Sequence, residues 1–157
     1  MRQEGLTLIE ILVVVAIVGL LAALAGVEYA GWTRKYTAEN EIRVLYGDLM
    51  AARVNAMQKN VQHMVVLSAD KYDACEDDDL DGSCDSMVNG LSKSNLKHSL
   101  LWGLVGGGDT ISFDRRGLSL VNGHVNIVAD GAEIDCVNIS ATRINVGRMR
   151  SGACVPK

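Results

Sequence analysis

Residues 6–27 form a run of 22 residues in which Glu10 is the single charged side chain. A helix needs about 20 apolar residues to cross a bilayer, so this run predicts a membrane span. A cleaved secretory signal peptide is the competing interpretation, and it needs a basic start, a shorter apolar core and a small-residue cleavage site. Residues 1–5 contain Arg2 as their one basic side chain, and residues 23–25 imitate such a cleavage site only weakly. The sequence therefore favours a retained apolar helix.

The charge inside this run needs an explanation. A carboxylate one helical turn into hydrocarbon costs about 2.5–3.5 kcal/mol, so Glu10 should have a partner or a function. A side chain that reaches back to the lipid headgroups is the simpler interpretation. The residues around it, Gly5-Leu6-Thr7-Leu8-Ile9-Glu10, follow a short charged leader. Together with the apolar run, they resemble the class III signal of type IV prepilins and type II secretion pseudopilins.

This resemblance implies how the N-terminus is processed and used. It implies cleavage after Gly5 by a prepilin peptidase and N-methylation of the new N-terminal residue, Leu6. It also gives Glu10 a partner, the Leu6 ammonium of a neighbouring pilin or pseudopilin in a filament. A buried carboxylate that faces a buried ammonium removes two unpaired charges at once. Before assembly, the same helix would anchor a single-pass subunit in the bacterial inner membrane with its head in the periplasm.

The helix is predicted to continue well beyond the apolar run. No proline occurs between residues 6 and 59, and one helix of about 50 residues, roughly 75–80 Å long, is expected. Apolar or small residues recur every three or four positions, as one face of an amphipathic helix requires: Ile42, Leu45, Leu49, Ala52 and Ala56. The resemblance divides the chain into a leader (1–5), a transmembrane or filament-core half of the helix (6–31) and a periplasmic head (32–157).

After Asn60 the composition changes to short apolar segments typical of strands. An Asn122-Gly123 pair between two of these segments predicts a hairpin. The expected strands are residues 63–67, 100–105, 110–113, 118–121, 124–128, 134–139 and 143–148. A long helix followed by an antiparallel β domain defines an α+β class, and this order of elements resembles the type IV pilin fold.

Four cysteines lie in the head and none in the apolar run. An even number of cysteines in an exported domain suggests disulfides, of which three connectivities are possible. We favour Cys75–Cys84 and Cys136–Cys154, because each pair encloses one expected loop. Zinc is the rival interpretation, but no C-x-x-C spacing supports it.

The loop between the first pair is acidic. Asp77, Asp79, Asp81 and Gly82 match the opening D-x-D-x-D-G of a calcium loop. The twelfth position is valine instead of the bidentate glutamate, and Asp85 falls at the ninth position. A calcium site is one expectation, and a solvated acidic loop pinned by a disulfide is the other.

The last seventeen residues carry four basic side chains and no acid, against a net charge of −4 for the whole chain. Within Gly147-Arg148-Met149-Arg150, the two arginines are two residues apart, which on a strand places them on one face about 6–7 Å apart. This tail, the helix and the β-rich head together resemble the GspH/FimT group of minor pilins and pseudopilins. In FimT proteins, a C-terminal G-R-x-R motif binds DNA during uptake, which implies Gly147, Arg148 and Arg150 as double-stranded DNA contacts. Arg143 and Lys157 are added on charge alone, and protection of an exposed edge strand is the alternative role.

Three functions follow as expectations. The first is a FimT-like minor pilin that primes or joins a pilus and binds DNA non-specifically in natural transformation. The second is a type II secretion pseudopilin of the GspH kind at the tip of a pseudopilus, and the third is a membrane-anchored calcium-binding module. Enzymatic activity is not expected, because the histidines match no metal or triad spacing: His63, His98 and His124. No cofactor is expected beyond a calcium ion.

Overall fold

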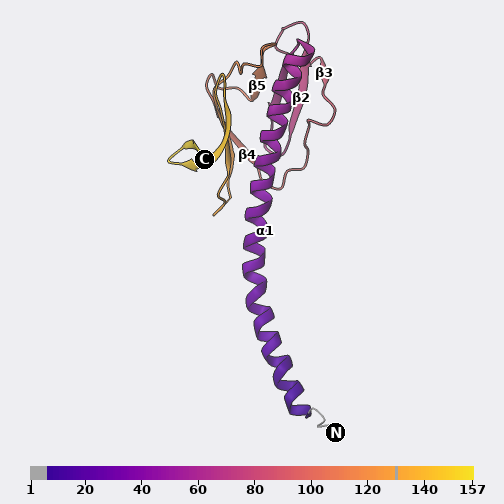
Figure 1. The fold of residues 1–157 in the computed structure, drawn as a ribbon, viewed down its shortest axis with the longest axis vertical. Helices are drawn as coiled ribbons and strands as arrows, with labels where there is room; N and C mark the ends of the chain where they lie inside the picture. The colour runs from indigo at the N-terminus through magenta and orange to yellow at the C-terminus, as the bar shows by residue number, and fades with distance from the viewer. Residues whose placement is uncertain (1–6, 130) are drawn as a thin grey trace. The chain divides into compact units, whose positions relative to one another are not determined.

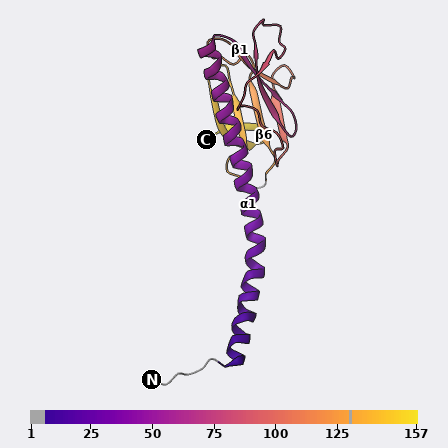
Figure 2. The same ribbon diagram turned by 90° about the vertical axis from the view of Figure 1, so that its right-hand side faces the viewer.

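A computed structural model describes residues 7–129 and 131–157, without the side chains of residues 24–28. The chain divides into two compact units, Met1–Arg34 and Lys35–Lys157. The described elements are one helix and nine strands (Figures 1 and 2). Their bounds are α1 Leu8–Lys59, β1 Gln62–Leu67, β2 Tyr72–Asp77, β3 Ser86–Met87, β4 Leu100–Leu104, β5 Thr110–Phe113, β6 Gly123–Ile127, β7 Cys136–Ile139, β8 Ile144–Arg150 and β9 Ala153–Pro156.

Helix α1 has 52 residues, so the prediction of one long uninterrupted helix is confirmed. Its N-terminus is capped by Thr7, whose hydroxyl and carbonyl oxygens both accept from the Glu10 N–H, at 3.4 and 3.1 Å. Such a cap satisfies one of the four N–H groups that a helix start leaves unpaired. The helix ends at Lys59, before Asn60 in the left-handed conformation (φ 57°) that commonly terminates helices.

The part of α1 within the second unit packs against the β head through one stripe of small and apolar residues. The predicted stripe is confirmed, with each member at most 1% exposed, and it begins one turn earlier than expected: Ala38, Ile42, Leu45, Leu49, Ala52 and Ala56. The alanines bring the helix backbone close to the strands, while the longer aliphatic side chains fill the space between. Residues of both sheets complete the same core, in which Phe113 from β5 is the largest apolar side chain after Tyr72.

The head consists of two antiparallel sheets that share this core (Figure 2). The first sheet has the strand order β3-β2-β1-β5, and the second has the order β4-β6-β7-β8-β9. Both sheets turn alternate apolar side chains toward the core, as half-buried strands do: Val65, Leu67 and Ile111 in the first sheet, and Val125, Ile127, Val137 and Ile139 in the second. The α+β class predicted from the sequence is confirmed.

The hairpin predicted at Asn122-Gly123 is wrong. Strand β6 begins at Gly123 and pairs with β4 and β7, while residues 118–121 form no strand. Residues 119 and 120 instead link the two sheets, because the Ser119 N–H donates to Ala141 O and the Leu120 N–H donates to Ser112 O, both at 2.9 Å. Gly123 has φ 152°, and a Cβ there would lie 2.7 Å from the Leu104 Cα. The glycine therefore serves close pairing with β4 instead of a two-residue turn.

Acidic side chains of α1 bind the connections and strands of the head. Glu41 accepts hydrogen bonds from the Lys97 backbone N–H at 2.7 Å and contacts His98 Nδ1 at 2.8 Å. Asp48 accepts a 2.5 Å hydrogen bond from the hydroxyl of Tyr72, which is 1% exposed. These contacts join segments far apart in the sequence, so the helix organises the loops as well as the core.

The buried Tyr72–Asp48 pair predicts a loss of stability at alkaline pH. Burial, followed by the hydrogen bond to Asp48 and its negative charge, raises the pKa of Tyr72 far above its ordinary value. The native state therefore keeps this proton where the unfolded chain releases it, above a pH of about 10. Tyr72 contributes its full share to the free energy of unfolding below that pH. Above it, the free energy of unfolding should fall by about 1.4 kcal/mol per pH unit.

Denaturant unfolding of the wild type and of Tyr72→Phe between about pH 9 and pH 11 measures this effect. The variant lacks the Tyr72 hydroxyl proton, so its free energy of unfolding should fall less steeply above pH 10, by about 1.4 kcal/mol per pH unit. Below pH 10 the variant should be about 1 kcal/mol less stable than the wild type, because it lacks the hydrogen bond. Parallel pH profiles of the two proteins would contradict the assignment.

Candidate functional site

The first turns of α1 expose apolar side chains on every side of the helix. They occupy almost every position and are each at least 49% exposed: Leu8, Ile9, Ile11, Leu12, Val13, Val14, Val15, Ile17, Val18, Leu20 and Leu21. A helix that is apolar all round requires an apolar environment on all sides. Considering only the residues that the structure describes, no helix is long and apolar enough to cross a membrane.

Glu10 lies in the first turn of this apolar segment and is exposed. A carboxylate is favourable there, because the N-terminal end of a helix carries partial positive charge. Residues 7–10 also read Thr-x-x-Glu, the pattern of a capping box, and the Thr7 half of that box is formed. Glu10 thus has a local role beside the predicted intermolecular one. Gly5 and Leu6, the predicted cleavage and methylation positions, lie outside the described residues.

The two tail arginines lie on a hairpin that the sequence analysis did not predict. Strands β8 and β9 pair with Arg148 opposite Val155 and Arg150 opposite Ala153. The connecting residues, Ser151 and Gly152, both have positive φ (49° and 82°), as a two-residue type I′ turn requires. The Ser-Gly pair was the signal that could have located this turn.

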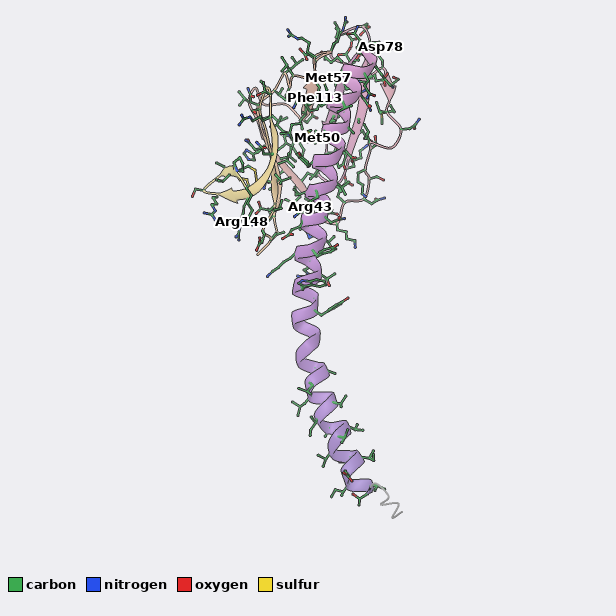
Figure 3. The ribbon with its side chains drawn as sticks, viewed as in Figure 1. Arg43, Met50, Met57, Asp78, Phe113 and Arg148 are labelled. Carbon is green, nitrogen blue, oxygen red and sulfur yellow. A yellow bond between two sulfur atoms is a disulfide. The ribbon has the colours of Figure 1, made fainter. Side chains whose placement is uncertain are left out.

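Both arginines are exposed on the same face of β8, as alternate residues of a strand must be. Figure 3 shows Arg148 on this hairpin, at the edge of the head. Among the ion pairs of the described residues, none involves Arg148 or Arg150. The hairpin therefore presents two guanidinium groups whose hydrogen-bonding capacity is available to a ligand.

Gly147 has a structural role of its own. The disulfide Cys136–Cys154 joins β7 to β9 and so crosses β8, where Gly147 pairs with Cys136. A Cβ at Gly147 would lie 3.1 Å from the Cys154 sulfur and would collide with the Val155 carbonyl. The glycine thus lets the disulfide and β9 approach β8. Its role in binding a ligand would be indirect, because it keeps the hairpin in place.

The other predicted tail residues differ in their surroundings. Lys157 is paired through its Nζ with the Glu133 carboxylate. The hydrogen bond and charge of Lys157 lower the pKa of Glu133, and the charge of nearby Arg148 lowers it further. Arg143 is exposed, and its backbone forms a tight turn with Ser140. The structure therefore groups Arg148 with Arg150 and assigns Lys157 an acidic neighbour.

The acidic loop is closed by the Cys75–Cys84 disulfide, and both disulfides have the connectivity that the sequence analysis favoured. Carboxylate oxygens of Asp77, Asp79 and Asp85 lie within 4.8 Å of one another. Asp81, the third predicted ligand, instead accepts hydrogen bonds from the Ser83 hydroxyl and N–H, which lower the pKa of Asp81. The cluster therefore contains the residue at the ninth position of the loop in place of the one at the fifth.

Comparison with known proteins finds a sequence motif and a similar fold. Residues 1–26 match the prokaryotic N-terminal methylation motif. The type IV minor pilin FimU of Pseudomonas aeruginosa (strain PAO1) has a similar structure, with a TM-score of 0.55 and 15% sequence identity over 76% of this chain and 99% of that chain. No curated protein sequence matches the chain.

The chain thus begins with a prokaryotic N-terminal methylation motif and has a fold similar to that of a type IV minor pilin. The type IV pilin fold predicted from the sequence is confirmed by this similarity.

Proposed function

We propose that the chain is a minor subunit of a type IV pilus or pilus-like filament, and that its C-terminal hairpin contacts DNA. The observation that carries the subunit role is the methylation motif, which includes the first part of a helix that is apolar on every side. In a filament, neighbouring helices would cover these side chains, and their burial would supply the driving force for assembly.

Processing would create the partner of Glu10. Cleavage by prepilin peptidase after Gly5 releases the α-amino group of Leu6, which is cationic once it is free. In the filament this ammonium would meet the Glu10 carboxylate of a neighbouring subunit, so that neither charge stays unpaired among apolar helices. The pairing also sets the axial position of each new subunit, because the charges meet at one depth only.

Before assembly, the apolar segment would hold the subunit in the inner membrane with its head in the periplasm. Residues beyond the apolar run support this stage. Tyr29 and Trp32 are 68% and 62% exposed, one helical turn apart, and Arg34 follows them. Aromatic side chains followed by a basic residue are typical of the boundary between lipid and water.

The DNA contact is proposed from the exposed arginine pair on β8. Two guanidinium groups on one face of a strand suit successive phosphates, to which arginine donates two hydrogen bonds at once. Asp78 of the acidic loop and Arg148 lie at different ends of the head (Figure 3). The negative charge of that loop is thus remote from the hairpin. Phosphate contacts carry no sequence information, so binding should be non-specific.

Titration of short duplex DNA with the full chain in detergent tests this proposal. The wild type should bind with micromolar or weaker affinity, and log K should fall with log salt at a slope of about −2. Arg148→Gln and Arg150→Gln should each weaken binding and reduce the slope by about one. The double variant should nearly abolish binding.

Charge-matched variants separate the hairpin from general electrostatics. Lys93→Gln with Arg115→Gln removes two exposed charges elsewhere and should leave the affinity nearly unchanged. Glu133→Gln should strengthen binding, because it releases Lys157 and removes a negative charge close to Arg148. An equal loss in the Lys93/Arg115 variant would contradict the assignment. Absence of binding at low salt would instead favour a tip subunit of a type II secretion pseudopilus.

A further inference from the structure

The acidic loop brings three carboxylates together with no basic side chain between residues 75 and 85. The carboxylate oxygens of Asp77, Asp79 and Asp85 lie within 4.8 Å of one another. Like charges this close repel one another. The loop is nevertheless held in this arrangement by the Cys75–Cys84 disulfide and by hydrogen bonds from Asp85 N–H to Glu76 O and from Asp78 N–H to Asp85 Oδ2.

A second observation comes from Asp77, the last residue of β2. Its side chain is fully buried, and its Oδ2 accepts hydrogen bonds from Gln62 Nε2 at 3.0 Å and from the Gly82 N–H at 3.1 Å. Its Oδ1 is also buried, yet it has no hydrogen-bond partner among the described residues. A buried carboxylate oxygen without a partner is costly, and native structures rarely keep one without a reason. A bound cation would give this oxygen a positively charged partner.

We propose that Asp77, Asp79 and Asp85 bind a calcium ion. The donor set consists of hard carboxylate oxygens, which suit calcium or magnesium and not zinc. Calcium accepts six to eight oxygens in a flexible arrangement, so water and loop carbonyl groups can complete its shell. Magnesium demands a regular octahedron and gives up water reluctantly, which an irregular surface loop does not favour.

The proposed ligands differ from an EF-hand in an identifiable way. Asp81, at the fifth position, accepts hydrogen bonds from Ser83. Asp85, at the ninth position, takes its place among the clustered carboxylates. With no glutamate at the twelfth position, the affinity should resemble that of extracellular calcium modules, with a Kd of about 0.1–1 mM. Binding would fix the loop that connects β2 to the edge strand β3 of the first sheet. It is independent of the proposed filament and DNA functions.

Thermal unfolding of the full chain in detergent, with calcium chloride, magnesium chloride or EDTA, tests the site. About 10 mM calcium should raise Tm by roughly 3–10 °C, and EDTA should reverse the rise. Magnesium at the same concentration should produce a smaller shift. An unchanged Tm together with no heat in a calorimetric calcium titration would overturn the proposal, and so would an equal shift with magnesium, because screening alone explains it.

Variants of single carboxylates identify the ligands. Asp79→Asn and Asp85→Asn, both at exposed positions, should each abolish the calcium-dependent rise in Tm. Asp78→Asn is the matched control, because it removes one exposed charge of the same loop outside the cluster, and it should keep the rise. Asp77→Asn should raise Tm in EDTA by removing a buried unpaired charge, yet should no longer respond to calcium. An equal loss of the response in Asp78→Asn would overturn the assignment.

Discussion

Glu10→Gln is expected to remove the protein from filaments almost completely while leaving it in the membrane fraction. The glutamine keeps the shape of the side chain and can still complete a capping box with Thr7. It loses the negative charge that the Leu6 ammonium of a neighbouring subunit would meet. Leaving one buried charge without its partner costs about 3–5 kcal/mol, which corresponds to a loss of about a hundredfold or more in assembly.

The comparison of two Glu10 variants separates the two roles of this residue. Glu10→Val loses both the charge and the side-chain oxygens that could complete the capping box, but it keeps the main-chain N–H that donates to Thr7. Glu10→Gln loses the charge alone. Immunoblots of sheared filaments and of membranes measure the distribution of each variant. If both variants are excluded from filaments to the same extent, the lost charge explains the defect and the ion pair is supported. The capping role of the side chain then makes no difference to assembly. Normal incorporation of Glu10→Gln would show that Glu10 acts on its own helix and would contradict the pairing.

Gly5→Leu is expected to retain the leader and to stay out of filaments. The residue before the scissile bond would then carry a branched side chain where the motif has none, and cleavage should fail. Without cleavage the Leu6 nitrogen remains part of a neutral peptide bond, so Glu10 has no cationic partner. Gly5→Ala, which adds the smallest side chain, is the matched control and should be cleaved to a greater extent.

The assembly defects caused by Gly5→Leu and by Glu10→Gln should not add. A Gly5→Leu/Glu10→Gln double variant should be no worse than either single variant, because both remove the same ion pair. Filament immunoblots quantify this. A double variant with a clearly larger defect than both single variants would show that the two residues act separately.

The helix and its buried stripe were predictable because both depend on local sequence. A 3.6-residue period places Ile42, Leu45 and Leu49 on one face whatever they pack against. Three strands were missed, namely β2, β3 and β9. β2 carries charged residues among its buried ones, β3 has two residues, and β9 ends in a proline that suits an edge strand.

The candidate sites were predictable only in part, since their geometry depends on contacts between distant residues. The spacing of Arg148 and Arg150 correctly placed them on one face of a strand. The pairing of Lys157 with Glu133 joins positions that only the folded sheet brings together. The burial of Asp77 likewise depends on how the loop returns over β2. The Thr7–Glu10 cap, by contrast, was readable as Thr-x-x-Glu at the start of an apolar helix.

The N-terminus of the mature protein shows directly whether the chain is processed as a pilin subunit. Mass spectrometry of the intact protein and of its N-terminal peptide, both purified from native membranes, locates the cut and any added methyl group. We expect a protein that begins at N-methylated Leu6, with residues 1–5 removed. A protein that begins at Met1, or one cleaved near Ala25, would contradict it.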